Sequence, residues 1–299
     1  MYWLGIFIAF ISPFSHAVSN IFDSYVVGDI FKKLPTTIFY MSLTNFIGLI
    51  FLFCFGSITF LPAQAYPFLF IVAAINVLYL FPYFAALRVS DTSVVAALFS
   101  LEKVFVPFFA YYFLREILCV SQYIGLFLIV LASMFLNLKN ARSLKFDKGF
   151  YLMLLTAFLL SFEGILYKKL LTYADWINVS FWCSLCSLLL CFTFLMFKPT
   201  RKDILKNKDV YQKNFSKFFV MELFDQIGYF APICALSFIP VVVETGISAT
   251  QPLFVALDIF ILNQIFHCHF NENLQFRNIV KKIICYVLII FGTYLIVGA

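Results

Sequence analysis

The chain has 299 residues, of which 63% are apolar and only 12% charged, and its formal net charge is +6. A soluble domain carries at most about half apolar residues and about 25% charged ones, so this composition excludes an ordinary water-soluble globular protein. A bilayer is the solvent that accepts so much apolar surface. The sequence therefore predicts an all-α integral membrane protein.

The first apolar stretch begins at Tyr2, with no basic residue before it. It contains His16 and Asp23 and runs longer than the apolar core of a secretory signal. We expect it to be retained as the first membrane helix rather than removed as a signal peptide.

Ten segments are long and apolar enough to be membrane helices, each needing about 20 residues. In chain order they are residues 2–27, 35–55, 65–87, 92–114, 120–138, 149–171, 176–197, 215–238, 241–265 and 280–297. Two longer polar connections separate them. Residues 139–148 fall at the middle of the chain and indicate a linker, and residues 198–213 indicate a solvated loop.

The two halves of the chain repeat at an offset of 149 residues. At this offset Ala86-Leu87 falls on Ala235-Leu236, Asn76 falls on Asp225, and Glu102-Lys103 falls on Gln251-Pro252. Because five helices is an odd number, the second half must cross the membrane in the opposite sense to the first. The predicted architecture is two inverted five-helix repeats, residues 1–138 and 149–299, joined by the linker 139–148.

The lysines and arginines between the helices are distributed unevenly. Seventeen follow the odd-numbered segments, three follow the even-numbered ones, and Lys103 lies within the fourth segment. The excess of positive charge marks the cytoplasmic side of short loops. The charge distribution therefore predicts that both termini lie outside.

Polar residues within the predicted helices fall at helical spacing on single faces, as expected for a central polar cavity. Those that we expect to bind substrate or a proton are His16, Asn20, Asn76, Tyr79, Tyr83, Glu102, Glu163, Tyr167, Glu222, Asp225, Gln226, Tyr229, Glu244 and Gln251. Glu222 and Asp225, with no basic residue in their stripe, favour a cationic or amine-bearing substrate, or a proton.

Several of these residues have an equally simple structural interpretation. Asp23 and Glu244 lie near helix ends, where water can solvate them. Glu102 and Lys103 are adjacent and can form an ion pair that fixes helix packing. Asp258 and Asn263 approach the end of the ninth segment and can act as structural caps.

No metal site or cofactor is expected. Cys183 and Cys186 form a CxxC pair inside an apolar run without a second pair, which is typical of packing thiols. His267, Cys268 and His269 are consecutive, and adjacent side chains rarely converge on one metal ion.

Residues 86–138 resemble the end of a repeat in the EamA family of the drug/metabolite transporter superfamily. The resemblance rests on Ala86-Leu87-Arg88, the small residues after it, Leu101-Glu102 and the apolar fifth segment with Gly125. Residues 235–299 are similar, with Thr250-Gln251-Pro252-Leu253 at the same place. Lys103 stands where the family has proline and Gln251 where it has glutamate. The resemblance implies a transporter with both termini in the cytoplasm, contrary to the charge distribution, and on this point we follow the charges.

These features predict a secondary active transporter in the bacterial cytoplasmic membrane. It would move a small metabolite by alternating access, with proton coupling and with membrane lipid as its other partner. The alternatives are a flippase for a lipid or lipid-linked carrier, and a membrane assembly protein that transports nothing. The sequence contains no HExxH, GxSxG or GxxxxGK[ST] motif, so we expect neither an intramembrane enzyme nor an ATP-driven pump. Nothing in it indicates nucleic-acid binding.

Overall fold

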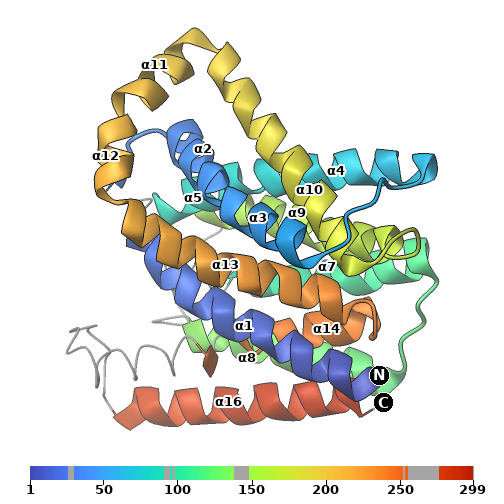
Figure 1. Ribbon diagram of the computed structural model, residues 1–299. Helices are drawn as coiled ribbons and strands as arrows, with labels where there is room; N and C mark the ends of the chain where they lie inside the picture. The colour runs from blue at the N-terminus through green and yellow to red at the C-terminus, as the bar shows by residue number, and fades with distance from the viewer. Residues whose placement is uncertain are drawn as a thin grey trace.

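The computed structural model describes residues 1–25, 30–90, 95, 98–137, 148–251, 253–254 and 276–298 (Figure 1). Within residues 20–25 and 276–282, and at residues 100 and 133, it describes the backbone alone. All regular structure in these ranges is helical. The helices are α1 Tyr2–Tyr25, α2 Leu34–Thr44, α3 Phe46–Phe55, α4 Tyr66–Leu78, α5 Leu80–Leu87, α7 Glu102–Phe109, α8 Val120–Asn137, α9 Lys148–Leu170, α10 Trp176–Phe192, α11 Lys198–Lys206, α12 Lys208–Lys213, α13 Phe215–Ala235, α14 Val241–Ser248 and α16 Phe276–Val297. Single turns occur at Ala63–Ala65, Phe99–Leu101, Ala110–Leu114 and Thr193–Met196.

Six of the described helical segments are long and apolar enough to cross a membrane, and they match the first, second, third, sixth, seventh and eighth predicted helices. Shorter apolar helices, Val120–Ala132 and Ile283–Val297, lie in the fifth and tenth. Large apolar side chains, Phe7, Phe127 and Ile290 among them, are exposed on the outside of the bundle, as lipid contact requires. The chain is a multi-pass integral membrane protein.

The structure differs from the predicted helices in three places. The second segment is broken at Asn45, between α2 and α3, and the third at Tyr79, between α4 and α5. The segment 198–213 is not an irregular loop but folds as α11 and α12, because Ile204 and Tyr211 are buried against other residues. The fourth and ninth segments are described only in part, and residues 258, 263 and 267–269 lie outside the described residues.

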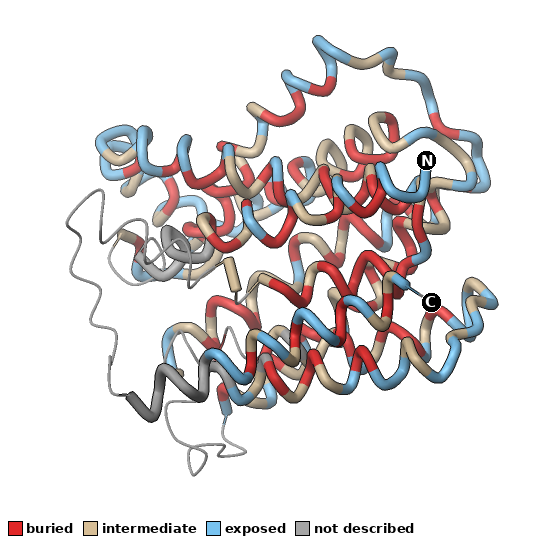
Figure 2. Tube along the Cα trace, turned by 90° about the horizontal axis from the view of Figure 1, so that it is seen from below, coloured by how far each residue is buried: buried red, intermediate tan, exposed pale blue. Residues whose placement is uncertain are grey.

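The helices pack in pairs that are far apart in the sequence (Figure 1). α1 lies along α13, α8 along α16, and α10 along α4. α9 packs against α4, α5 and α7, while α14 packs against α1. Red, buried positions in Figure 2 follow the inward faces of these helices. The two termini lie at one end of the bundle and α12 at the other (Figure 1).

α8 and α16 approach each other more closely than side chains on both would allow. A Cβ on Gly125 would lie 2.6 Å from the carbonyl oxygen of Gly292, and a Cβ on Gly292 would lie 2.8 Å from the carbonyl oxygen of Gly125. Small residues permit this kind of backbone contact between membrane helices. The two glycines therefore set the separation of these helices.

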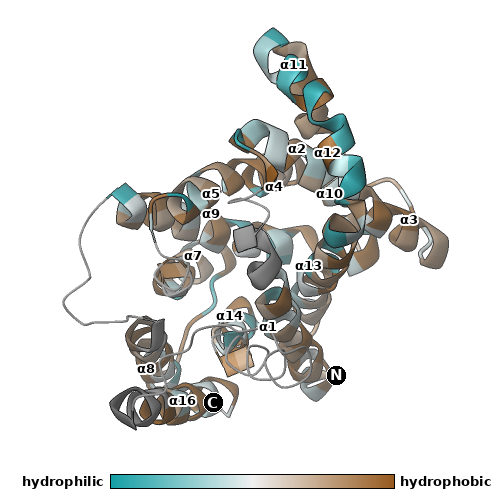
Figure 3. Cartoon of the chain, turned by 90° about the vertical axis from the view of Figure 1, so that its left-hand side faces the viewer, coloured by the Kyte–Doolittle hydropathy of each residue, from teal (hydrophilic) through white to brown (hydrophobic). Residues whose placement is uncertain are grey.

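The polar helices α11 and α12 are fastened to the start of α2, and Figure 3 shows their hydrophilic colouring against the apolar bundle. Asp203 accepts a hydrogen bond from Thr36 at 2.5 Å and lies 3.1 Å from the Lys33 ammonium. The rings of Tyr40 and Tyr211 stack with their centroids 4.4 Å apart. This segment is therefore docked on the bundle.

A second group of hydrogen bonds between distant segments lies at the start of α10. Asp175 caps the helix by accepting from the backbone amides of Ile177 and Asn178. The buried Asn178 side chain accepts from the Thr59 amide at 2.7 Å. Trp182 donates its ring N–H to the Thr59 carbonyl at 2.8 Å. The segment that precedes α4 is thus held against α10.

Candidate functional site

Four polar side chains from three helices meet inside the bundle: Asn76 of α4, Glu163 and Tyr167 of α9, and Tyr229 of α13. Asn76, oriented to satisfy its neighbours, donates to Glu163 Oε1 at 2.5 Å and accepts from the phenols of Tyr167 and Tyr229 at 2.9 and 3.1 Å. The two phenol oxygens also lie within hydrogen-bond reach of each other, so their two protons are shared among these contacts, and the rings meet edge to face. We call these four residues the Glu163 site.

Glu163 is 8% exposed and lies two turns before the end of α9. Among the residues that the structure describes, no lysine, arginine or histidine forms an ion pair with it. The carboxylate of Glu102 acts on it electrostatically, and the two repel each other. Burying a carboxylate is costly unless a cation or a proton compensates it. The site is therefore suited to hold one or the other.

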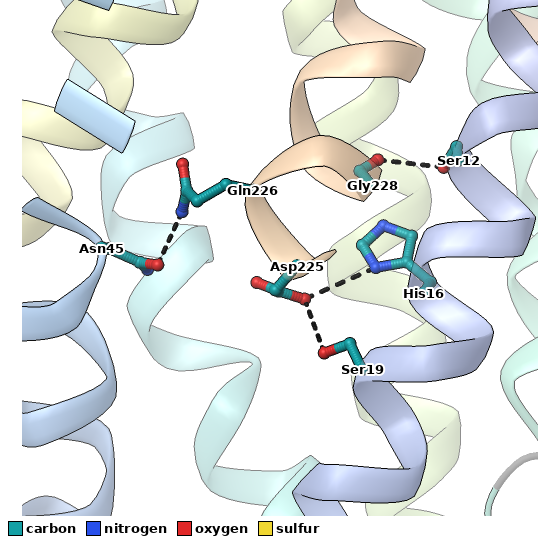
Figure 4. Close-up of polar contacts among 7 residues, drawn as sticks. All are labelled: Ser12, His16, Ser19, Asn45, Asp225, Gln226 and Gly228. Atoms are coloured by element: carbon teal, nitrogen blue, oxygen red, sulfur yellow. Dashed lines mark hydrogen bonds and ion pairs between the residues drawn. The ribbon is translucent and has the colours of Figure 1, made fainter. Parts of the chain in front are cut away.

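A second polar contact joins α1 and α13 (Figure 4). His16 Nδ1 lies 3.5 Å from Asp225 Oδ1, and Ser19 donates to the same oxygen at 3.3 Å. Ser12 donates to the Gly228 carbonyl at 3.0 Å. Gly228 faces the imidazole so closely that a Cβ there would lie 2.8 Å from ring atoms of His16. Both ionisable side chains remain about one-third exposed, so water reaches this pair.

Gln226 points away from Asp225, toward the break between α2 and α3 (Figure 4). Its amide donates to Asn45 Oδ1 at 2.6 Å. The polar stripe predicted on the eighth helix therefore divides among three directions: Asp225 faces α1, Gln226 faces Asn45, and Tyr229 faces the Glu163 site. Glu222, only 2% exposed, interacts instead with Tyr211 of α12.

The prediction that these four residues of the eighth helix line one common cavity was therefore wrong. Residues at i, i+3, i+4 and i+7 span an arc wide enough to contact several neighbouring helices when the helix is surrounded. The expectation that no basic residue accompanies Asp225 was wrong, because His16 reaches it from α1.

A third group lies where α7 meets α14. Lys103 is 8% exposed, and its ammonium lies 2.9 Å from Glu102 Oε2. Glu244 is 9% exposed and accepts from Ser248 at 2.5 Å. Lys103 attracts Glu244 electrostatically, and Glu102 repels it. The ion pair expected from sequence is present, and Glu244 is buried rather than solvated.

The remaining predicted site residues lie elsewhere. Tyr83 packs its ring against Phe84 and Phe99 in a second apolar core, which Tyr79 borders. Gln251 is half-buried just beyond α14. The side chain of Asn20 lies outside the described residues. Cys183 and Cys186 are free thiols in the first core, and the described residues contain no group suited to a metal ion.

Two residues that form hydrogen bonds with predicted site residues, Ser19 with Asp225 and Asn45 with Gln226, were not predicted. Ser19 lies three residues after His16, and its helical spacing was the available signal. Asn45 is a lone amide in an apolar run, and its position at a helix break was the signal there.

Comparison with known proteins identifies a family for residues 3–138 and a similar fold for nearly the whole chain. Residues 3–138 match the EamA-like transporter family. A solved structure titled only "Crystal structure of protein" superposes with a TM-score of 0.63 over 98% of this chain and 94% of its own, at 14% sequence identity. No curated protein matches the chain. Residues 3–138 are therefore an EamA-like transporter family domain, part of the drug/metabolite transporter superfamily.

Proposed function

We propose that the protein is a secondary active transporter that exchanges protons for a small amine-bearing or cationic metabolite. The observation that carries the proposal is Glu163, a buried carboxylate in a membrane helix that is bonded to an amide and surrounded by phenols. Ionisable groups within membrane helices mark substrate and proton pathways.

The chemistry of the Glu163 site favours a cation. Asn76 supplies the carboxylate with one hydrogen bond, and an ammonium ion or a proton supplies the missing positive charge. The hydroxyl groups of Tyr167 and Tyr229 lie at the amide that holds the carboxylate, and their oxygens can accept hydrogen bonds from an ammonium ion. A phosphate or carboxylate substrate finds no matching charge there.

The proposal includes ten membrane helices arranged as two inverted repeats, residues 1–138 and 149–299. The helix contacts support it, because the offset of 149 residues exchanges them in pairs. α1 against α13 corresponds to α9 against α4 and α5. The repeat exchanges α8 with α16, so the contact between these two helices maps onto itself. Inverted repeats place substrate sites near the interface of the two halves.

Under the same offset Asn76 corresponds to Asp225. Asn76 contacts α9 at Glu163, and Asp225 contacts α1 at His16. Each half therefore provides one polar contact between its third helix and the first helix of the other half. Rocking of the halves changes both interfaces together, which is how alternating access would expose Glu163 to either side.

Transport then follows from competition. A proton neutralises Glu163 while the site is closed to water, and exposure to one side lets a cationic amine displace it. Reorientation carries the amine across, and a proton displaces it on the other side. We place the transporter in the bacterial cytoplasmic membrane, where a proton gradient supplies the energy.

The test is amine-driven proton movement in proteoliposomes. Vesicles that contain a pH-sensitive dye are given a panel of primary and quaternary amines, and the wild-type protein is expected to move protons against at least one of them. Glu163→Gln and Asp225→Asn are expected to abolish this movement while the proteins remain folded and inserted.

Asp209→Asn is the matched control, because this carboxylate is exposed on α12. It is expected to retain wild-type flux. If Glu163→Gln and Asp225→Asn keep the proton dependence of the wild type, these carboxylates are structural. Flux of a lipid-linked carrier without proton movement would favour the flippase alternative.

A further inference from the structure

Two groups of helices meet at the Glu163 site. α9 packs with α4 and α5, which we call the α9 group, and α13 packs with α1, which we call the α1 group. Tyr229 of α13 reaches the α9 group at Asn76 and Tyr167. Alternating access requires the two groups to part on one side of Glu163 while they stay in contact on the other. A bond between the groups at either end of the bundle would therefore act as a gate.

Lys168 forms such a bond in the last turn of α9. It follows Glu163 by five residues, which places it about 7.5 Å further along the helix axis. Its ammonium nitrogen donates to the backbone carbonyl of Leu236 at 2.5 Å and to that of Ile239 at 2.8 Å. These carbonyls follow the last turn of α13, where a helix leaves its carbonyls without partners. A cation of the α9 group thus caps a helix of the α1 group.

The connection between α13 and α14 that Lys168 holds lies at the end of the bundle where the termini lie. A Cβ on Gly5 would lie 2.8 Å from Ile239 Cγ2, so the start of α1 packs directly on this connection. Glu116, which precedes α8, approaches the connection at its other end, with Oε1 3.5 Å from the Val241 amide. The connection therefore moves with the α1 group, and Lys168 and Glu116 hold it from outside that group.

The ammonium cap belongs to one half of the chain only. At the offset of 149 residues Lys168 corresponds to Ser19, and the carbonyls that it caps correspond to those of Leu87 and Ser90. Ser19 carries no charge, and its hydroxyl donates to Asp225 within the α1 group. The repeated architecture therefore has a lysine at one end of the bundle and an uncharged residue at the corresponding position.

We infer that Lys168 is a positioning residue that keeps the Glu163 site closed on the side of the termini. The inference rests on the proposed function, because alternating access opens this side once in each cycle. When the α9 group moves away from α13, Lys168 leaves both carbonyls and water replaces it. Because the bonds exist only in the closed conformation, they stabilise it relative to the open one. Their removal shifts the population toward the conformation that is open on this side.

The test measures access to the Glu163 site from each side of the membrane. Cys183 is the reporter, because it is fully buried in the same apolar core as Tyr167, and serine replaces the other cysteines. A membrane-impermeant maleimide is added to intact cells and to inverted membrane vesicles. Lys168→Met is expected to raise the labelling rate from the side of the termini at least about threefold, and to leave the rate from the other side no higher than in the wild type.

Lys169→Met is the matched control, because the Lys169 ammonium lies 5.7 Å from the ring centroid of Tyr173. It is expected to label at the wild-type rate. Lys168→Arg keeps a charged donor and is expected to label more slowly than Lys168→Met.

Faster labelling of Lys168→Met from both sides would indicate a general loosening of the bundle and would overturn the inference. A change of less than about threefold would also overturn it, as would an equal effect in Lys169→Met. If Lys168→Met does not insert, Lys168→Gln replaces it. Failure of both variants to insert would show that the lysine is needed for folding and would contradict a gating role.

The outcome is distinguishable from that of the proposed function, because labelling requires no substrate. Glu163-dependent flux in the wild type, without side-specific labelling in Lys168→Met, leaves transport intact and refutes the gate. Side-specific labelling in Lys168→Met, without flux in the wild type, refutes proton–amine exchange and leaves the gate.

Discussion

Asn76 links α4 to two other helices through a single side chain. It donates to Glu163 and accepts from both Tyr167 and Tyr229. Each partner is a buried or half-buried polar group for which the apolar surroundings offer no substitute. Removal of the Asn76 amide takes one hydrogen bond from each of these groups, and the cost of an unsatisfied buried group exceeds the benefit of making the bond.

We therefore predict that Asn76→Leu destabilises the folded protein by about 1–3 kcal/mol, because the buried Glu163 loses its hydrogen bond to the amide. Unfolding in detergent, followed by fluorescence at increasing temperature, measures this effect. Gln212→Leu, at an exposed position on α12, is the control and is expected to change little. Equal stability of both variants would contradict the geometry of the Glu163 site.

The individual site residues were predictable only as candidates. Helical spacing identified His16, Glu163 and Asp225, because intramembrane ionisable residues are rare and stand out. It could not assign their partners, since a helix surrounded by neighbours presents each face to a different one. Asp225 and Gln226 are adjacent in sequence and contact opposite sides of α13 (Figure 4).

At the scale of helices, α8 and α16 depend on a pair of glycines. A Cβ at Gly125 or Gly292 would meet the backbone carbonyl of the other helix. Gly164 on α9 has nothing within 4 Å of where its Cβ would be. The two environments provide a matched comparison.

We expect Gly125→Ala and Gly292→Ala to destabilise the protein by about 1–3 kcal/mol, because the helices must separate. Gly164→Ala should be neutral, or stabilising by about 0.5–1 kcal/mol through its greater helix propensity. Thermal unfolding of the three variants decides the matter. If Gly164→Ala proved the most destabilising, the close contact of α8 and α16 would be wrong.

The docked segment α11–α12 is expected to respond to acid. Partial burial raises the pKa of Asp203, but hydrogen bonds from Thr36 and Lys33 and the Lys33 charge outweigh burial, so the pKa lies below its ordinary value of about 3.9. The carboxylate therefore stabilises docking at neutral pH, and this contribution disappears as the pH falls through the lowered pKa.

Hydrogen exchange of α11 measures this effect. In the wild type, protection should fall on acidification, whereas in Asp203→Asn it should be low already at neutral pH and change less. Asp209→Asn, on the exposed side of α12, is the control. Acid-dependent protection that survives in Asp203→Asn would show that another group fastens the segment.

Hydropathy predicted the long helices well, because lipid contact demands continuous apolar runs. It did not predict the breaks at Asn45 and Tyr79, although Pro82 follows Tyr79 by three residues and a proline disturbs the helix one turn before it. The Asn45 break coincides with a bond from Gln226, a residue 181 positions away. Likewise, α11 and α12 form because Ile204 and Tyr211 find distant apolar partners, which local composition does not reveal.

For the whole molecule, the orientation in the membrane is a prediction with a clear test. Seventeen basic loop residues follow the odd-numbered helices. The basic helices α11 and α12 lie at the end opposite the termini (Figure 1). Since positive loops remain in the cytoplasm, both termini should lie outside.

An alkaline phosphatase fused after Ala299 should therefore be active, and a fluorescent protein fused at the same place should be dark. The same pair of fusions placed after Lys206 should give the opposite result. Fluorescence of the C-terminal fusion would show that the C-terminus lies in the cytoplasm and would refute the predicted orientation.

The central claim is that Glu163 exchanges a proton for a cation, and the most direct measurement is proton release on amine binding. Purified protein in weakly buffered detergent solution is titrated with the amine found in the flux assay, and a pH dye records the released protons. The wild type is expected to release up to about one proton per bound amine, and Glu163→Gln none. Equal release from both proteins would contradict the claim.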